Sequence, residues 1–250
     1  MNILEFVEQI KRSLAIVKKD LSIYYMKGPV VIFGLLLPAF LFIAFALGKE
    51  LTMEFLFSGL LAMALFFTST SIGPAIAPTE TSTKTFERIV SAPISLWAII
   101  FGDILASFLF GLFIISFVLL LGVALLGMGI ITLSLVLGTI LAAFCFSAFG
   151  LVLSAPPTDK PSNIMMLSTL IKFPLIFISG VFIPLNQMSD GSRLISFISP
   201  LTYYTDIARY SVEGISYFSP VLNLLILSGF TTLFFAVAII WHKKSLTKRF

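Results

Sequence analysis

Cysteine and histidine, two residue types that often perform nucleophilic and acid–base catalysis, each occur once in this 250-residue sequence. Cys145 is the single cysteine and lies within an apolar run, so the sequence contains no internal disulfide and no cysteine metal cluster. His242 is the single histidine and stands beside Lys243 and Lys244, where it is expected to reach polar surroundings. An enzyme would need clustered nucleophiles and bases, or a Gly-x-Ser-x-Gly context. The sequence therefore predicts neither a catalytic site nor a metal site.

Lys172 is the one charged residue deep within a long apolar segment. A lysine at bilayer depth costs about 2.5–3.5 kcal/mol, so it should face a partner, water or the protein interior. One interpretation is that Lys172 lines a translocation path. The alternative is that its segment is broken or begins late, which would let Lys172 snorkel to the surface. Asp103 lies near an expected membrane boundary, where a structural pair with a basic residue is favoured over a proton-coupling role.

Composition indicates an all-α integral membrane protein. Hydrophobic residues make up 58% of the chain, charged residues 11%, and the mean hydropathy is +1.08. Residues 28–48, 55–79 and 104–158 contain no charged side chain, and a helix needs about 20 apolar residues to cross a bilayer. The short alternating segments of a β-barrel are missing from the sequence. We interpret residues 1–250 as one transmembrane domain with six spans at 29–48, 53–77, 96–121, 131–153, 163–183 and 219–241.

Three further segments are expected outside these spans. Residues 1–28 carry apolar side chains alternately four and three positions apart from Ile3 to Leu21, which favours an amphipathic helix on the membrane surface over a short coiled coil. This pattern also argues against a cleavable signal peptide. Residues 84–92 predict a short helix that Pro93 ends. Residues 184–218 predict one or two short external helices that are interfacial or re-entrant.

The positive residues predict the orientation. Six spans place both termini on one side, and three basic residues, Lys49, Arg193 and Arg209, then fall on the other side. Cytoplasmic loops are enriched in Lys and Arg, so both termini and the helix at 84–92 are expected to be cytoplasmic. Twelve of the 16 Lys and Arg residues lie in the segments assigned to the inside: Lys11, Arg12, Lys18, Lys19, Lys27, Lys84, Arg88, Lys160, Lys243, Lys244, Lys248 and Arg249.

Three stretches resemble a known family when read in this order. Glu80 and the run from Thr85 to Ser95 resemble the cytoplasmic segment of type-2 ABC exporter permeases, with Lys84 where the family usually has glycine. The stretch 179–185 is similar to the end of that family's fifth span. The stretch 199–209, Ser-Pro-Leu-Thr-Tyr-Tyr-Thr-Asp-Ile-Ala-Arg, is similar to the segment before its sixth span. The resemblance covers essentially the whole chain.

The resemblance implies the permease half of an ATP-driven exporter for a lipidic, drug-like or polymer substrate in the cell membrane. Because the chain has no Gly-x4-Gly-Lys-[Ser/Thr] phosphate loop, ATP and Mg²⁺ would be bound by a separate ABC ATPase, and this chain would carry no cofactor. The other expected partners are a second permease, identical or related, and membrane lipids, but no nucleic acid.

The resemblance also assigns roles to residues. The segment that couples to the ATPase would contain Lys84, Thr85, Phe86, Glu87, Arg88, Ile89, Val90 and Pro93. Within it, Phe86, Ile89 and Val90 share one face and would insert into a groove of the ATPase. The external gate segment would contain Pro184, Pro200, Tyr203, Asp206 and Arg209.

The alternative function is an ion- or proton-coupled secondary transporter. That class depends on acidic residues inside the membrane and often on inverted repeats. The sequence has no convincing repeat between its halves, and its one deep charge is the cation Lys172. The exporter permease is therefore the favoured interpretation.

Overall fold

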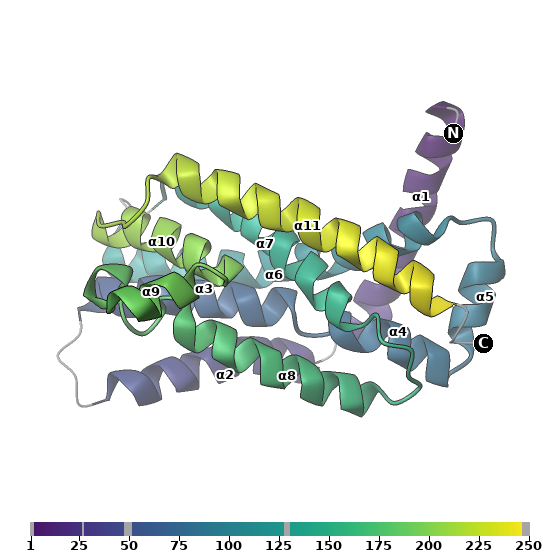
Figure 1. Ribbon diagram of the computed structural model, residues 1–250, viewed down its shortest axis with the longest axis horizontal. Helices are drawn as coiled ribbons and strands as arrows, with labels where there is room; N and C mark the ends of the chain where they lie inside the picture. The colour runs from purple at the N-terminus through teal and green to yellow at the C-terminus, as the bar shows by residue number, and fades with distance from the viewer. Residues whose placement is uncertain (1–2, 27, 48–51, 128–130, 247–250) are drawn as a thin grey trace.

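A computed structural model describes residues 3–26, 28–47, 52–127 and 131–246, and these residues form helices without any strand (Figure 1). Within those ranges, five helices are long and apolar enough to cross a membrane, which agrees with a multi-pass membrane protein. They are Met53–Ser82, Leu96–Ala124, Leu133–Leu153, Pro161–Ile178 and Pro220–Leu246. Helix α2 (Gly28–Ala46) occupies most of the first expected span, whose last residue, 48, lies outside the described residues. The count of six spans stays a prediction.

The centre of the bundle is built from four helices that contact one another. They are α3 (Met53–Ser69), α6 (Leu96–Leu126), α7 (Leu133–Leu153) and α10 (Pro200–Glu213). Phe66 of α3 meets Phe146 of α7 edge to face at 5.0 Å between ring centroids, and both rings are fully buried. Tyr204 of α10 lies against Phe146 and shares a 2.9 Å hydrogen bond with the Thr139 hydroxyl. The core thus combines aromatic packing with a satisfied buried hydroxyl.

The remaining helices cover this centre (Figure 1). Helix α11 (Pro220–Leu246) lies along α7 and α10, and α2 packs on α3. Helix α8 (Pro161–Ile178) contacts α4 (Gly73–Ser82). The N-terminal helix α1 (Ile3–Asp20), the helix α5 (Thr85–Ser91) and the C-terminus lie at one end of the bundle, with α9 (Asp190–Ser196) and α10 at the other.

The second expected span, 53–77, is not one continuous helix. Helix α3 ends at Ser69, and α4 begins at Gly73 and runs on to Ser82. The carbonyl of Thr70 would accept a hydrogen bond from the N–H of residue 74 in a continuous helix. Residue 74 is proline and has no N–H, so the helix breaks here and leaves that carbonyl available to another donor.

Other boundaries also differ from those expected, and α6 runs to Leu126, past the expected end of the third span at 121. Helix α8 ends at Ile178 instead of continuing to 183, because the chain turns at Gly180, whose φ of 80° favours glycine. Helix α11 continues past 241 to Leu246. Between them, a 3-10 turn (Leu185–Gln187) and α9 precede α10, which is buried among α3, α7 and α11.

Candidate functional site

Helix α5 stands where the short helix was expected at 84–92, at the end of the bundle that carries both termini (Figure 1). Lys84 precedes it with a φ of 55°, a left-handed conformation that glycine adopts most readily. Ala92 follows it with a ψ of 157°, the extended conformation that Pro93 imposes on the residue before it. Local backbone chemistry therefore fixes both ends of α5.

The orientation of α5 corrects one expectation. Phe86 is only 4% exposed, so its ring packs into this chain and does not project toward a partner. Ile89 and Val90 are half-buried, whereas Glu87 and Arg88 are exposed. The apolar face that the periodicity predicted is thus used mainly to attach α5 to its own chain. The side of α5 that carries the charged side chains of Glu87 and Arg88 is left exposed.

Hydroxyl groups hold α5 to the end of α4. The Thr85 hydroxyl donates to the Glu80 carbonyl at 3.3 Å and lies 2.9 Å from the Thr83 hydroxyl. The Thr83 hydroxyl in turn donates to the Thr79 carbonyl at 2.8 Å. Because these bonds satisfy carbonyls at the end of α4, the turn between the helices is fixed. A displacement of α5 would therefore move α4 with it.

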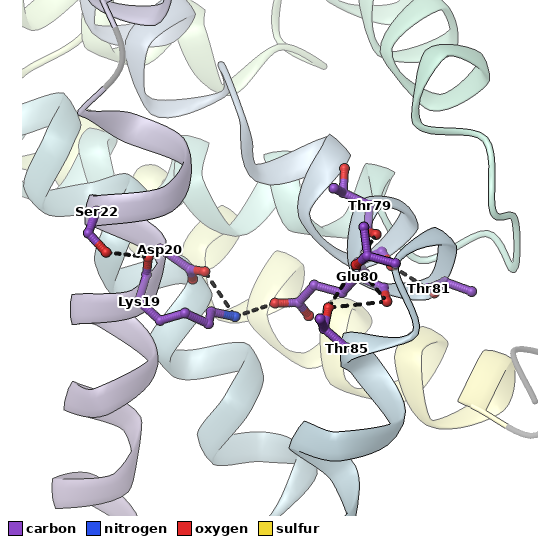
Figure 2. Close-up of polar contacts among 9 residues, drawn as sticks. Lys19, Asp20, Ser22, Thr79, Glu80, Thr81 and Thr85 are labelled. Carbon is purple, nitrogen blue, oxygen red and sulfur yellow. Dashed lines mark hydrogen bonds and ion pairs between the residues drawn. The ribbon is translucent and has the colours of Figure 1, made fainter.

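A buried ionic cluster ties the same region to α1. Figure 2 shows the Lys19 ammonium between the carboxylates of Asp20 and Glu80, both of which are almost completely buried. The Lys19 nitrogen lies 3.0 Å from Asp20 Oδ1 and also forms an ion pair with Glu80. Asp103 of α6, 4% exposed, lies beside Asp20 and acts electrostatically on Lys19. The cluster joins α1, α4 and α6.

Three carboxyl groups surround one ammonium in this cluster, so negative charge would be in excess if all three were ionised. Burial lowers the pKa of Lys19, but attraction by Asp103, Asp20 and Glu80 outweighs it and leaves the pKa above its ordinary value. Burial raises the pKa of Asp20, against the opposing effect of Lys19. Lys19 is therefore charged at neutral pH, and the cluster favours a proton on one of its carboxyl groups.

Helix α1 also packs closely on α6. A Cβ at Gly102 would lie 2.7 Å from Ile16 Cβ and 2.8 Å from the Ser13 carbonyl, so the absence of a side chain permits this approach. Gln9 accepts hydrogen bonds from the Ser95 N–H at 2.7 Å and the Ser95 hydroxyl at 3.0 Å, which caps the start of α6. Tyr25, in the π-helical turn (Leu21–Tyr25) that follows α1, hydrogen-bonds Ser107. Polar contacts thus lock α1 to α6 along its length.

A groove of about 410 Å³ separates α1 from α5. Ile16, Ile89 and Pro93 contribute apolar walls, and Arg12 and Arg88 contribute positive charge. The groove lies where the exposed face of α5 meets α1. It combines mainly apolar walls with two positive charges, which would suit an apolar partner segment that carries acidic residues.

Lys172 of α8 is buried, with 6% of its surface exposed. Its ammonium donates a 2.8 Å hydrogen bond to the Thr70 carbonyl, the group that Pro74 leaves without a helical donor. The alternative in which Lys172 snorkels to the surface is therefore wrong for this structure. The residue faces the bundle interior beside a cavity that α2 and the α3–α4 break also line.

The residues expected in the external gate segment form a polar network at the opposite end. The Arg209 guanidinium donates to the carbonyls of Gly180 and Val181, each at 3.0 Å, and pairs with Glu213 at 2.9 Å. It also lies over the Phe55 ring at 4.3 Å. Arg209 thus ties α10 to the turn after α8 and to α3.

Asp206 and Tyr203 fix the neighbouring turns. The Asp206 carboxylate accepts hydrogen bonds from the N–H groups of Tyr217 and Phe218, at 2.8 and 2.9 Å. It also accepts one from the Asn223 side chain at 2.8 Å. Tyr203 donates to the Phe197 carbonyl at 2.9 Å. The two prolines of the expected gate segment stand at the starts of helical elements: Pro184 is the N-cap of the 3-10 turn, and Pro200 is the first residue of α10.

The comparison with protein families decides the identity. A family model described as ABC-2 type transporter matches residues 5–212, well over half of the chain. The chain belongs to the ABC-2 type transporter family. A search of curated proteins gave no match. The resemblance found in the sequence is thereby confirmed.

Family membership makes this ABC-2 transporter chain a membrane permease component, and the family implies an ABC ATPase as its partner. The match includes α1, α5, the ionic cluster, Lys172 and Arg209, so all of the candidate sites belong to the family domain. ABC-2 permeases typically have no ATPase site of their own. The exposed side of α5 and the groove beside it are consequently the candidate contact with that partner.

Sequence reasoning missed several residues that hold this ABC-2 permease together. Asp20 follows Ile16 by four positions and Val17 by three, so it lies on their side of α1, and an acid beside these two apolar residues was the available signal. Gln9 and Thr70 gave no such signal. Their partners lie 86 and 102 positions away, and only the packed structure brings them together.

Proposed function

We propose that this chain is the permease subunit of an ATP-driven exporter, with six spans and both termini in the cytoplasm. A separate ABC ATPase would bind ATP and Mg²⁺. The substrate would be lipidic, drug-like or polymeric. The observation that carries the proposal is α5, a short helix fixed outside the bundle with a charged face exposed.

The charged face and the groove support α5 as the coupling helix. Glu87 and Arg88 would pair with charges at the rim of an ATPase surface, and the groove beside Arg12 would receive part of that surface. The position of the face that carries Glu87 and Arg88 would be set by the rest of the segment: Lys84, Thr85, Ile89, Val90 and Pro93. The buried ring of Phe86 would anchor α5 to the rest of this chain.

Helix α1 supports the same contact. Val7 and Leu14 of its apolar stripe are 45% and 52% exposed, which fits a helix that rests on the membrane surface. The opposite face of α1 is held by Lys19, Gln9 and Gly102. A helix fixed between lipid and bundle in this way would brace α5 while the ATPase moves.

The proposed motion is a rigid-body transmission. Closure of the ATPase pair would push α5, and the threonine bonds would pass that movement to α4. The break at residues 70–72 would allow α4 to tilt relative to α3, while Arg209 and Asp206 would hold the other end of the bundle. Rocking of packed helices about such a break is a known mode of switching.

Gentle affinity purification from the native membrane tests the proposal most directly. We expect a soluble ATPase with a phosphate loop to copurify in stoichiometric amounts, and its hydrolysis rate to depend on this chain. If the chain purifies without any ATPase in several mild detergents, no subunit is left to hydrolyse ATP, and ATP-driven export is rejected. An ion-coupled transporter would then be the function to test.

Charge reversal on α5 tests the coupling surface. We expect Arg88→Glu or Glu87→Arg to reduce the stimulation of ATP hydrolysis about tenfold, because each change loses a charged contact worth about 1.5–3 kcal/mol. Lys11→Glu, an exposed reversal elsewhere on the same end of the bundle, is the matched control. Normal stimulation by the Arg88 and Glu87 variants would place the contact elsewhere.

A further inference from the structure

A cavity of about 310 Å³ lies between α2, the α3–α4 break and α8. Its walls are mainly apolar and include Leu37, Phe67, Met165 and Phe173. Ligand cavities in proteins span about 300–1,000 Å³ and usually combine apolar walls with a few fixed polar groups. This cavity has the size of a small ligand site, and its charged group is Lys172.

The Lys172 ammonium has hydrogen-bonding capacity to spare. It carries three N–H donors, and one of them is used by the Thr70 carbonyl. In the part of the chain that the structure describes, no Asp or Glu forms an ion pair with Lys172. A buried charge normally has a counter-charge nearby, so an anion within the cavity would complete the site.

We propose that this cavity binds a single-chain amphiphile with an anionic head. The carboxylate or phosphate would accept hydrogen bonds from Lys172, beside the helix break. The acyl chain would lie against Phe67, Phe173 and Leu37. The charge of Lys172 and the apolar lining together select an anionic amphiphile. A small polar anion would leave the apolar walls in contact with water, and a neutral lipid would leave the ammonium without a counter-charge.

The inference deepens the proposed function, on which it rests for the statement that this amphiphile is the exported substrate. The cavity adjoins the break that we expect to bend during transport, so movement of α4 would reshape its wall at Ser71 and Ile72. Binding itself requires no ATPase. The site and the motor can therefore be tested separately.

Photolabelling tests the site. The full chain, with any subunits that copurify, is placed in phosphatidylcholine nanodiscs and exposed to decanoic acid carrying a diazirine near its chain end. The matching diazirine decanol is the neutral control probe. We expect the acid to label peptides of α2, α3 and α8 about tenfold more than the alcohol, as one lost charge-assisted hydrogen bond predicts.

Variants of the cavity make the test specific. Lys172→Gln should lower acid labelling about tenfold, to the level of the alcohol, whereas Lys172→Arg should retain it. Thr169 lines the cavity, and its hydroxyl bonds only within α8, so Thr169→Trp fills the space without breaking a contact between helices. This variant should block both probes, and it keeps the test informative if Lys172→Gln fails to fold.

Equal labelling of wild type and Lys172→Gln by the acid, or labelling spread evenly over all lipid-facing helices, would overturn the proposal. Phosphatidylglycerol in the nanodisc distinguishes the two sources of an anionic head. Suppression of labelling means that a two-chain acidic bilayer lipid occupies the site and would overturn the single-chain assignment, whereas unchanged labelling supports a free single-chain acid. If the ATPase still copurifies but the acid does not label the cavity, the proposed ligand site is rejected and the ATPase-coupled function is kept. If the acid labels the cavity but no ATPase copurifies, the ligand site is kept and the ATPase-coupled function is rejected.

Discussion

Lys19 shows how single residues hold the candidate coupling region together. Its ammonium is shared by the buried carboxylates of Asp20 and Glu80 and lies within the field of Asp103. Removing the cation takes away the counter-charge that three carboxyl groups share in this cluster, whereas removing one carboxylate leaves the cation still paired. Buried ionic groups are far more sensitive to loss of the only counter-charge than to loss of one charge among several.

We therefore predict that Lys19→Met lowers the free energy of unfolding by about 3–5 kcal/mol, and Glu80→Gln by only about 1 kcal/mol. Tryptophan fluorescence during thermal unfolding in detergent measures the difference. In Lys19→Met the folded state should bind protons more tightly than the unfolded state, so its stability should rise as the pH falls from about 8 to about 5. A Lys19→Met protein as stable as wild type at pH 8 would contradict the ionic link.

At the scale of elements, α5 depends on the conformation of Lys84. The left-handed backbone at this position costs about 1–2 kcal/mol for a residue with a Cβ, and glycine does not have this cost. We predict that Lys84→Gly keeps normal stimulation of the partner ATPase and is at least as stable as wild type. Lys84→Val, whose branched side chain resists this conformation, should displace α5 and reduce stimulation. Equal activity of the two variants would show that the turn does not position α5.

The elements differ in how far the sequence predicts them. Uncharged runs predict long apolar helices because the bilayer excludes charge, but they do not reveal the break between α3 and α4, whereas Pro93 ends α5 as expected. Phe86 was placed on the wrong side because periodicity shows that a helix has an apolar face but not which neighbour that face meets. The pairing of Lys172 with Thr70 follows from Pro74, but only tertiary packing determines which donor reaches the freed carbonyl.

For the whole molecule, the surface leaves two lightly covered helices, α8 and α11, on which a second permease would be able to pack. Helix α8 is a lightly covered helix, with Met166 and Leu170 65% and 64% exposed on one face. We predict that a second permease, and not lipid alone, covers this face of α8. An interface there would set the α8 cavities of the two copies close to each other.

We predict that cysteines on this face form cross-links between copies in native membranes. In a Cys145→Ala background, Met166→Cys or Leu170→Cys should yield a product of twice 27.4 kDa on mild oxidation. Leu225→Cys is the matched control, because it is 62% exposed but lies on α11. Cross-linking through Leu225 instead would move the interface to α11. A product whose mass is this chain plus a different permease would make the transporter a heterodimer.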